Sequence, residues 1–296
     1  MKLSSEDLQQ LTAVAIKTAK QAGDIIAEHA PRQVDVLHKD GGDNIASQVV
    51  TEVDYLCDKT IRDSLQASCQ QFDLALLTEE TEDDKARLEK DYFWCVDPMD
   101  GTLSFIESKP GYSVSMALVA KSGEPIIGVI HDPHSKITYS GVKGQGAFID
   151  GEVWQADSDS VTAPSVMTLV CDRGFTDTGY FPELEKALTQ LAQESGCSAL
   201  DIRVQTGAAM NAIWVLQHQP AIYIKCPKTA EGGGSSWDFA ASAAIYNEHG
   251  ASATDFYGEP LALNNADTTF MNQGGIIYCA SKKKSAAIQS LLSYCS

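Results

Sequence analysis

Two aspartates lie close together at the end of an apolar segment, in residues 97–102, Asp-Pro-Met-Asp-Gly-Thr. Carboxylates at this spacing repel each other unless a cation lies between them. Their oxygens suit Mg²⁺, Mn²⁺ or Ca²⁺ better than zinc. The segment therefore indicates a divalent-cation site, although an ordinary Asp-Pro-x-Asp-Gly surface turn is the commoner use of such residues.

The two residues after Asp100 extend the chemistry of this turn. The backbone N–H groups of Gly101 and Thr102 are candidates to bind a phosphate oxygen. A phosphatase with an aspartate nucleophile would carry Asp-x-Asp-Gly-Thr, with the nucleophile two residues before the second Asp. Pro98 stands at that position, so a phospho-aspartyl mechanism is not expected.

Two short strands are predicted to bring acids to one sheet edge. The apolar residues 92–96 predict a buried strand that ends at Asp97, because Pro98 cannot donate the hydrogen bond that would continue the ladder. Residues 72–77 predict a second strand, followed directly by Thr-Glu-Glu. If the strands are neighbours, Glu79 and Asp97 lie together. The alternative is that the acidic run from Glu79 is a solvated loop.

Two further acids lie at predicted helix starts. Residues 49–67 predict a helix with Asp54 in its first turn, and residues 238–249 predict a helix that Asp238 opens. An acid at such a position usually caps the helix or interacts with its dipole. Both residues therefore have an ordinary structural explanation beside a role in an acidic site.

The order of elements indicates the fold class. Residues 112–150 predict an antiparallel meander without a crossover helix, which argues against a doubly wound parallel sheet. A Ser-, Thr- and Asp-rich stretch at 155–165 is the predicted boundary between halves at 1–155 and 156–296. The other predicted elements are helices at 5–29, 181–195 and 208–217, strands at 166–170 and 221–225, and three strand-like pieces after 249.

Composition argues against several classes of function. The net charge of −18 disfavours a nucleic-acid polymer as partner, but not a small phosphorylated substrate, because bound cations reverse the local sign. No apolar run approaches the ~20 residues needed to span a bilayer. The first residues lack the apolar core of a signal peptide. We therefore expect a cytoplasmic protein without membrane contact, in which the cysteines are reduced. Because the sequence contains no Cys-x-x-Cys pair, we do not expect a zinc site.

Four motifs together resemble the inositol monophosphatase family, which includes the 3′(2′),5′-bisphosphate nucleotidases. They are Val-Val-Thr-Glu-Val-Asp at 49–54, Thr-Glu-Glu at 78–80, Trp-Cys-Val-Asp-Pro-Met-Asp-Gly-Thr at 94–102 and Trp-Asp at 237–238. The resemblance covers most of the chain. It implies an α+β fold, a layered αβαβα sandwich whose N-terminal half carries most metal ligands. It also implies a Mg²⁺-dependent phosphomonoesterase, often a homodimer, that lithium inhibits.

The resemblance implies oxygen ligands for two Mg²⁺ ions, with Mn²⁺ as a substitute. The ligands are Glu79, Asp97, the carbonyl of Met99, Asp100 and Asp238. Asp97 would bridge the two ions, and Glu79 would also face a third, weaker and mostly hydrated ion. The residue types agree with this, since four crowded carboxylates are tenable only around about two divalent cations.

Catalytic roles follow from the same resemblance for Asp54, Thr102 and Glu79. Thr102 and Asp54 would orient the water that attacks phosphorus, which the cations activate near neutral pH. Gly101 and Thr102 would bind the phosphate through their backbone N–H groups. The C-terminal half would complete the site with Asp238 and with substrate loops.

Substrate choice rests on weaker matches. Residues 202–211 resemble the Ile-Arg-x-x-Gly-Thr-Ala-Ala-x-Asn of inositol monophosphatases with Gly and Thr exchanged, and Asn211 stands where nucleotidases tend to carry Lys. This favours inositol monophosphate or a related small sugar or polyol phosphate. The alternatives are a 3′(2′),5′-bisphosphate nucleotidase acting on 3′-phosphoadenosine 5′-phosphate, and a non-catalytic regulator that binds cations or phosphate. The candidates for substrate contacts are Asp172, Arg173, Ala208 and Glu231, with Lys225 as the other match to the family's inositol-binding glutamate.

Overall fold

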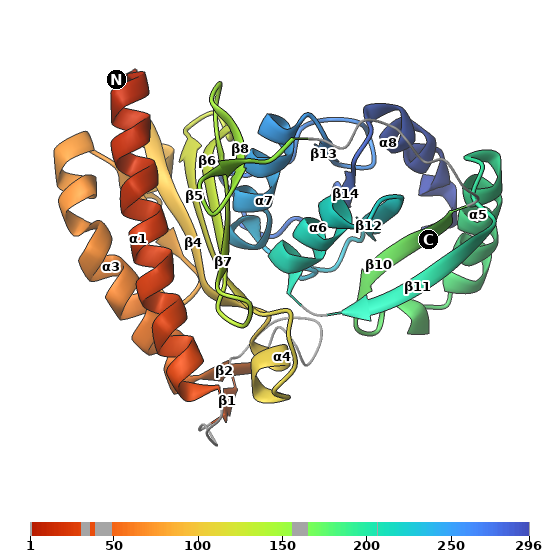
Figure 1. The fold of residues 1–296 in the computed structure, drawn as a ribbon, viewed down its shortest axis with the longest axis horizontal. Coiled ribbons are helices and arrows are strands. Elements are labelled where there is room, and N and C mark those ends of the chain that lie inside the picture. Colours follow the sequence, from red (N-terminus) through yellow and green to blue (C-terminus); the bar gives the residue numbers. More distant parts are fainter. Residues whose placement is uncertain (1, 31–35, 39–48, 156–164, 206, 296) are drawn as a thin grey trace.

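The chain folds into five alternating layers of helices and sheets, as Figure 1 shows from α1 and α3 on one side to α5 and α8 on the other. The computed structural model describes residues 2–30, 36–38, 49–155, 165–205 and 207–295. The predicted αβαβα sandwich is confirmed. Its helical layers are α1 (Ser5–His29) with α3 (Glu52–Phe72), then α6 (Ala208–Gln217) with α7 (Ser236–His249), then α5 (Phe181–Glu194) with α8 (Lys282–Gln289).

Two sheets separate these helical layers, and the first is the predicted meander. Its seven strands lie in sequence order: β3 (Ala75–Thr78), β4 (Tyr92–Asp100), β5 (Ser113–Ala120), β6 (Pro125–Asp132), β7 (Ile137–Val142), β8 (Gly146–Ile149) and β9 (Glu152–Val153). The strands β3 and β4 are parallel, and every following pair in this sheet is antiparallel. The meander over 112–150 is thereby confirmed.

The second sheet has the strand order β11-β10-β12-β14-β13. Its strands are β10 (Val166–Asp172), β11 (Ala199–Gln205), β12 (Ala221–Lys225), β13 (Ser252–Thr254) and β14 (Ile276–Cys279). The smaller elements are β1 (Val36–His38), β2 (Val49–Thr51), α4 (Thr102–Ile106) and the 3₁₀ turns η1 (Ala86–Leu88), η2 (Phe175–Asp177) and η3 (Ser290–Tyr294). Because β10 and β12 are parallel neighbours, the ends of both strands lie at one edge.

Helix α1 spans the predicted residues 5–29. Ser4 caps it, and the Asp7 carboxylate accepts a hydrogen bond from the Ser4 N–H in return. One face, from Leu11 to Ile26, is buried against the first sheet. In none of the described ranges does a helix combine the length and apolarity that a membrane span needs.

The helix predicted at 49–67 is wrong at both ends. Residues 49–51 pair with β1 as strand β2, because two valines and a threonine favour extended backbone. Thr51 then caps α3, which continues to Phe72 and ends at Asp73 in the left-handed conformation. The strand predicted at 72–77 therefore begins only at Ala75.

Strand β4 continues beyond the predicted end at Asp97. Asp97 pairs with Ser115 and Asp100 pairs with Ser113, so β4 advances three residues where β5 advances two. The extra residue forms a bulge, and Pro98 is tolerated there because a bulge leaves one residue out of the ladder. The bulge, rather than the end of the strand, turns the two carboxylates toward one place.

The C-terminal part differs most from prediction. Strand β11 was not predicted, although Leu200, Ile202 and Val204 alternate with polar residues as in a half-buried strand; it lies at a sheet edge and is largely exposed. The three strand-like pieces predicted after 249 are wrong, since two strands, β13 and β14, are followed by helix α8 and the turn η3. The Lys-Lys-Lys-Ser-Ala-Ala sequence that opens α8 consists mainly of good helix formers.

Helices α6 and α7 join the two sheets into one core. Buried residues of the first sheet, such as Phe93, and of the second, such as Tyr223, belong to the same hydrophobic cluster as Phe239 of α7. The predicted boundary at 155–165 lies almost wholly outside the described residues, and the division into halves stays a prediction. The shared core explains how Asp238, far along the chain, reaches β4.

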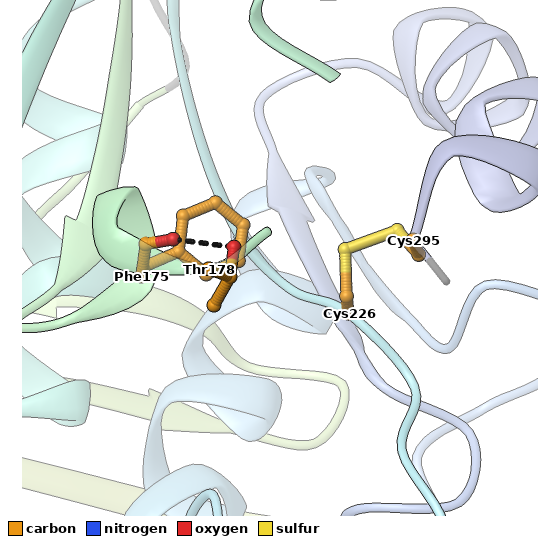
Figure 2. Close-up of a disulfide and its surroundings, with 4 residues drawn as sticks. All are labelled: Phe175, Thr178, Cys226 and Cys295. Carbon is orange, nitrogen blue, oxygen red and sulfur yellow. Dashed lines mark hydrogen bonds between the residues drawn. A yellow bond between two sulfur atoms is a disulfide. The ribbon is translucent and has the colours of Figure 1, made fainter. Parts of the chain in front are cut away.

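A disulfide joins Cys226, just after β12, to Cys295 near the C-terminus (Figure 2). The expectation of reduced thiols is therefore wrong for this pair. No sequence pattern indicated this bond, because the two cysteines are 69 residues apart and only the fold brings them together. The other six cysteines are free thiols.

Loss of this disulfide is expected to lower stability. Cys295→Ser should reduce the free energy of unfolding by about 4 kcal/mol, because the bond closes a long loop and restricts the unfolded chain. Urea denaturation without reductant measures the change. Wild-type protein in dithiothreitol should match the variant, and Cys69→Ser, at a partly buried free thiol, is the control. An unchanged wild-type midpoint in reductant would show that the bond contributes nothing.

Candidate metal-binding active site

Three carboxylates converge where β4 ends and α7 begins. One oxygen from each of Asp97, Asp100 and Asp238 lies within 4.8 Å of the other two. The β4 bulge supplies the first two, which are buried, and the first turn of α7 supplies the third. The structure thus brings together three of the metal ligands predicted from the sequence.

Asp238 is oriented by the loop that precedes its helix. Its carboxylate accepts a hydrogen bond from the Ser235 N–H, which closes a capping box at the start of α7. Gly234 has a φ of 101°, and a Cβ there would lie 2.8 Å from the Phe239 ring. The helix-cap role expected for such an acid and a position in the cluster are therefore compatible.

Asp100 is held by the start of α6. Its Oδ1 accepts from the Ala208 N–H at 2.9 Å and its Oδ2 from the Ala209 N–H at 2.8 Å. The preceding Gly207 has a φ of 90°, and a Cβ there would lie 1.9 Å from the Gly111 carbonyl oxygen. Ala208, a candidate for substrate contact, thus uses its N–H to position a carboxylate.

Asp54 and Thr102 form the predicted pair. The Thr102 hydroxyl donates to Asp54 Oδ1 at 2.8 Å, while the Thr51 N–H donates to Asp54 Oδ2 at 2.7 Å. The Thr102 hydroxyl also lies 3.1 Å from the Met99 carbonyl oxygen. Burial raises the pKa of Asp54 to about 6, against the hydrogen bonds from Thr51 and Thr102. A carboxylate that binds a hydroxyl beside the cluster can help to orient water.

Glu79 lies next to the cluster without belonging to its three-oxygen core. Its N–H donates to the Val96 carbonyl at 3.2 Å, so it follows β3 at the level where Asp97 leaves the regular β4 ladder. Its charge raises the pKa of Asp97 and of Asp238, after the larger effect of burial. The two acids thus lie near each other at one sheet edge, and the ligand role of Glu79 stays a prediction.

The electrostatics of the cluster fit a hard divalent cation. Burial and neighbouring carboxylates raise the pKa of Asp97 and Asp100 well above the ordinary range and that of Asp238 to about 7. Such a shift means that the ionised cluster is costly without a compensating charge. The converging groups are carboxylates without a thiol or imidazole among them, which suits Mg²⁺ or Mn²⁺.

These pKa shifts predict how metal-free protein responds to pH. The folded state keeps protons on Asp54 until about pH 6 and on Asp238 until about pH 7, whereas the unfolded chain loses them near 3.8. The folded state binds more protons in this window, so the free energy of unfolding should fall as the pH rises through it. Urea denaturation in EDTA between about pH 5 and about pH 8 measures this, and saturating Mg²⁺ should flatten the slope. Stability that rises over this window in EDTA would contradict the electrostatic account.

Of the remaining substrate candidates, two form ion pairs with other side chains and one is exposed. Asp172 ends β10 and forms an ion pair with Lys225 at 2.6 Å. Arg173 donates two hydrogen bonds to Glu107, at 2.6 and 2.7 Å, and so links the loop after β10 to the end of α4. Glu231 is exposed in the loop before α7, and no contact in the described part of the chain joins it to the cluster.

Sequence reasoning did not find the network around Asp172. Tyr223 and Asn211 are buried and donate hydrogen bonds to it, at 2.9 and 3.1 Å. The sequence comparison offered Lys225 only as the other match, beside Glu231, to the family's inositol-binding glutamate. The sequence feature that could have indicated the network was a lysine at the end of a predicted strand in an acidic chain.

Comparison with known proteins gives a consistent result. The sequence profile of the inositol monophosphatase family matches residues 7–294. The Nus factor SuhB of Salmonella typhimurium is 26% identical over 261 residues, covering 85% of this chain and 87% of that protein. The fructose-1,6-bisphosphatase/inositol-1-monophosphatase of Thermotoga maritima is 28% identical over 264 residues, covering 89% of this chain and 91% of that protein.

A solved structure shares the fold. An IMPase/NADP phosphatase complexed with Mg²⁺ and phosphate superposes with a TM-score of 0.70 at 17% sequence identity, covering 97% of this chain and 95% of that one. The layered sandwich with its central helices is therefore common to both chains. At this level of identity the likeness concerns the fold alone.

Proposed function

Because this chain belongs to the inositol monophosphatase family, we propose that it is a Mg²⁺-dependent phosphomonoesterase that hydrolyses a small sugar or polyol phosphate, such as inositol monophosphate. The observation that carries the proposal is the convergence of Asp97, Asp100 and Asp238 within 4.8 Å. Asp100 and Asp238 each bind a helix start, but gathering three carboxylates, two of them buried, in one place is costly, because their charges repel. A bound cation would compensate for this repulsion.

Five residues would hold the cations. Glu79, Asp97 and the Met99 carbonyl would bind the first, and Asp97, Asp100 and Asp238 the second, with a third and weaker ion facing Glu79. Bound divalent cations would stabilise the negative charge of the phosphoryl group during its transfer. They would also lower the pKa of a bound water, so that it can act as a nucleophile near neutral pH. The bond from the Met99 N–H to Asp97 Oδ1, at 2.9 Å, already orients the proposed bridging carboxylate.

The chain's own residues would handle the water and the phosphate. The Thr102 hydroxyl, which donates to Asp54 Oδ1 at 2.8 Å, would accept a hydrogen bond from the attacking water and relay the proton that the water loses to the Asp54 carboxylate. Gly101 has a φ of 87°, so the chain turns sharply from β4 into α4. Backbone N–H groups of Gly101 and Thr102 would bind phosphate oxygens, while Asp100 stays fixed by α6.

Two other functions remain as alternatives. A 3′(2′),5′-bisphosphate nucleotidase would use the same cluster on 3′-phosphoadenosine 5′-phosphate. A non-catalytic regulator that binds cations or phosphate is favoured by a different finding, since a relative is named a Nus factor. The absence of a nucleic-acid partner, the homodimer, the cytoplasmic location and the sensitivity to lithium stay predictions.

Phosphate release from a substrate panel tests the proposal. The panel contains inositol monophosphates, fructose bisphosphate and 3′-phosphoadenosine 5′-phosphate, each with Mg²⁺, with Mn²⁺ and with EDTA. We expect metal-dependent hydrolysis with an inositol or related sugar phosphate as the best substrate. Preference for 3′-phosphoadenosine 5′-phosphate would establish the nucleotidase alternative. Cation binding by calorimetry without turnover of any compound would favour the regulator.

A further inference from the structure

A lysine beside the carboxylate cluster has no part in the function proposed above. Lys225 ends β12, and its ammonium lies 2.6 Å from Asp172 Oδ2 at the end of the neighbouring strand β10. The same nitrogen lies 5.2 Å from the centre of the Phe239 ring. Phe239 follows Asp238 directly in the first turn of α7. The ammonium therefore lies next to the turn that carries a proposed cation ligand.

The position of this ammonium is fixed rather than adjustable. Asp172 Oδ1 accepts from the Tyr223 hydroxyl and from Asn211 Nδ2, so Asp172 can neither rotate nor withdraw without breaking two partly buried hydrogen bonds. The side chains of Lys225 and Asp172 are only 19% and 29% exposed. Water and salt screen such a partly buried pair less than a surface pair.

The charge on Lys225 acts on the cluster. Burial raises the pKa of Asp100 and of Asp238, and the ammonium shifts both pKa values in the opposite direction. In return Asp172, Asp238 and Asp100 raise the pKa of Lys225 against the effect of burial, so the lysine stays protonated. The fixed positive charge of Lys225 near Asp100 and Asp238 therefore repels a cation that binds to these two carboxylates.

We propose that Lys225 is a positioning residue, a built-in cation beside Asp100 and Asp238 that sets the affinity of the second Mg²⁺ position. The inference rests on the proposed function, because it assumes that divalent cations bind these carboxylates. The ion pair then places one fixed positive and one fixed negative charge near these carboxylates. Its two members act in opposite directions: the lysine weakens cation binding and Asp172 strengthens it.

Calorimetric titration with Mg²⁺ tests these opposite signs. Lys225→Met should tighten binding of the second Mg²⁺ ion, beside Asp100 and Asp238, by roughly tenfold, as expected for one unit charge in a partly solvated site. Asp172→Asn, which leaves the lysine unpaired, should weaken it by a similar factor. Lys225→Arg keeps the charge and should retain wild-type affinity. Lys186→Met makes the same change in net charge on α5, at a side chain that is 72% exposed, and should leave the affinity unchanged.

The outcomes separate this inference from the proposed function. Structural damage would weaken Mg²⁺ binding in both Lys225→Met and Asp172→Asn, so shifts in the same direction would overturn the proposal. Wild-type affinity in both variants would also overturn it, while the proposed function would stand. A wild-type protein that binds no Mg²⁺ would overturn both. Thermal denaturation of each variant in EDTA establishes that it is folded before titration.

Discussion

Asp97→Asn is expected to abolish most phosphatase activity while leaving the fold intact. Asp97 is buried in the β4 bulge and is the proposed bridge between two cations. Neutralising it removes negative charge from both cation positions. Because metal ions contribute several kcal/mol to transition-state stabilisation and each ~1.4 kcal/mol changes the rate tenfold, kcat should fall roughly 10³-fold or more. Steady-state kinetics with saturating Mg²⁺ measures the loss.

Stability separates a lost site from a lost fold in this experiment. Without metal, Asp97→Asn should be at least as stable as the wild type, because one source of carboxylate repulsion is gone. Asp63→Asn is the matched control, as its side chain is 68% exposed on α3, and it should keep full activity. Wild-type turnover of Asp97→Asn in saturating Mg²⁺ would rule out the two-cation assignment.

Thr102→Ala is expected to lower kcat strongly while changing Mg²⁺ affinity little. The Thr102 side chain has no place among the proposed cation ligands, and its hydroxyl is bonded to Asp54. General-base assistance of this kind is worth ~10²–10⁴ in rate. The backbone N–H survives the substitution, so phosphate binding should persist. Calorimetry and turnover on the same samples distinguish the two effects.

The partner variants sharpen this prediction. Asp54→Asn should resemble Thr102→Ala, and the double variant should cost less than the sum of the two, because the pair acts as one unit. Thr102→Ser keeps the hydroxyl and should retain most activity. If Thr102→Ala loses metal binding in step with activity, or loses neither, Thr102 does not activate water.

The sequence was sufficient for the parts of the site that lie in local motifs. Asp97 and Asp100 share one turn, and Glu79 follows a strand that pairs with β4, so short-range patterns indicated an acidic edge. Asp54 and Asp238 were ambiguous, because a helix-cap acid and a functional acid have the same local sequence. In the structure both are capping residues and both lie at the site. The family resemblance, rather than periodicity, separated those roles.

Features that depend on long-range register were not predictable in this way. The ion pair of Asp172 with Lys225 requires that β10 and β12 lie side by side, which follows from packing around α6 and α7. The Cys226–Cys295 bond depends on where the C-terminal turn docks. The β4 bulge was missed because Pro98 normally ends a ladder, and only the pairing with β5 shows the extra residue.

Anomalous diffraction from crystals grown with Mn²⁺ and inorganic phosphate would test the central claim most directly. Mn²⁺ is the expected substitute for Mg²⁺ and can be located by its own scattering. The account predicts two manganese peaks with Asp97 between them, one beside Asp100 and Asp238 and the other beside Glu79 and the Met99 carbonyl. Crystals with manganese elsewhere on the protein, or with none at these carboxylates, would contradict it.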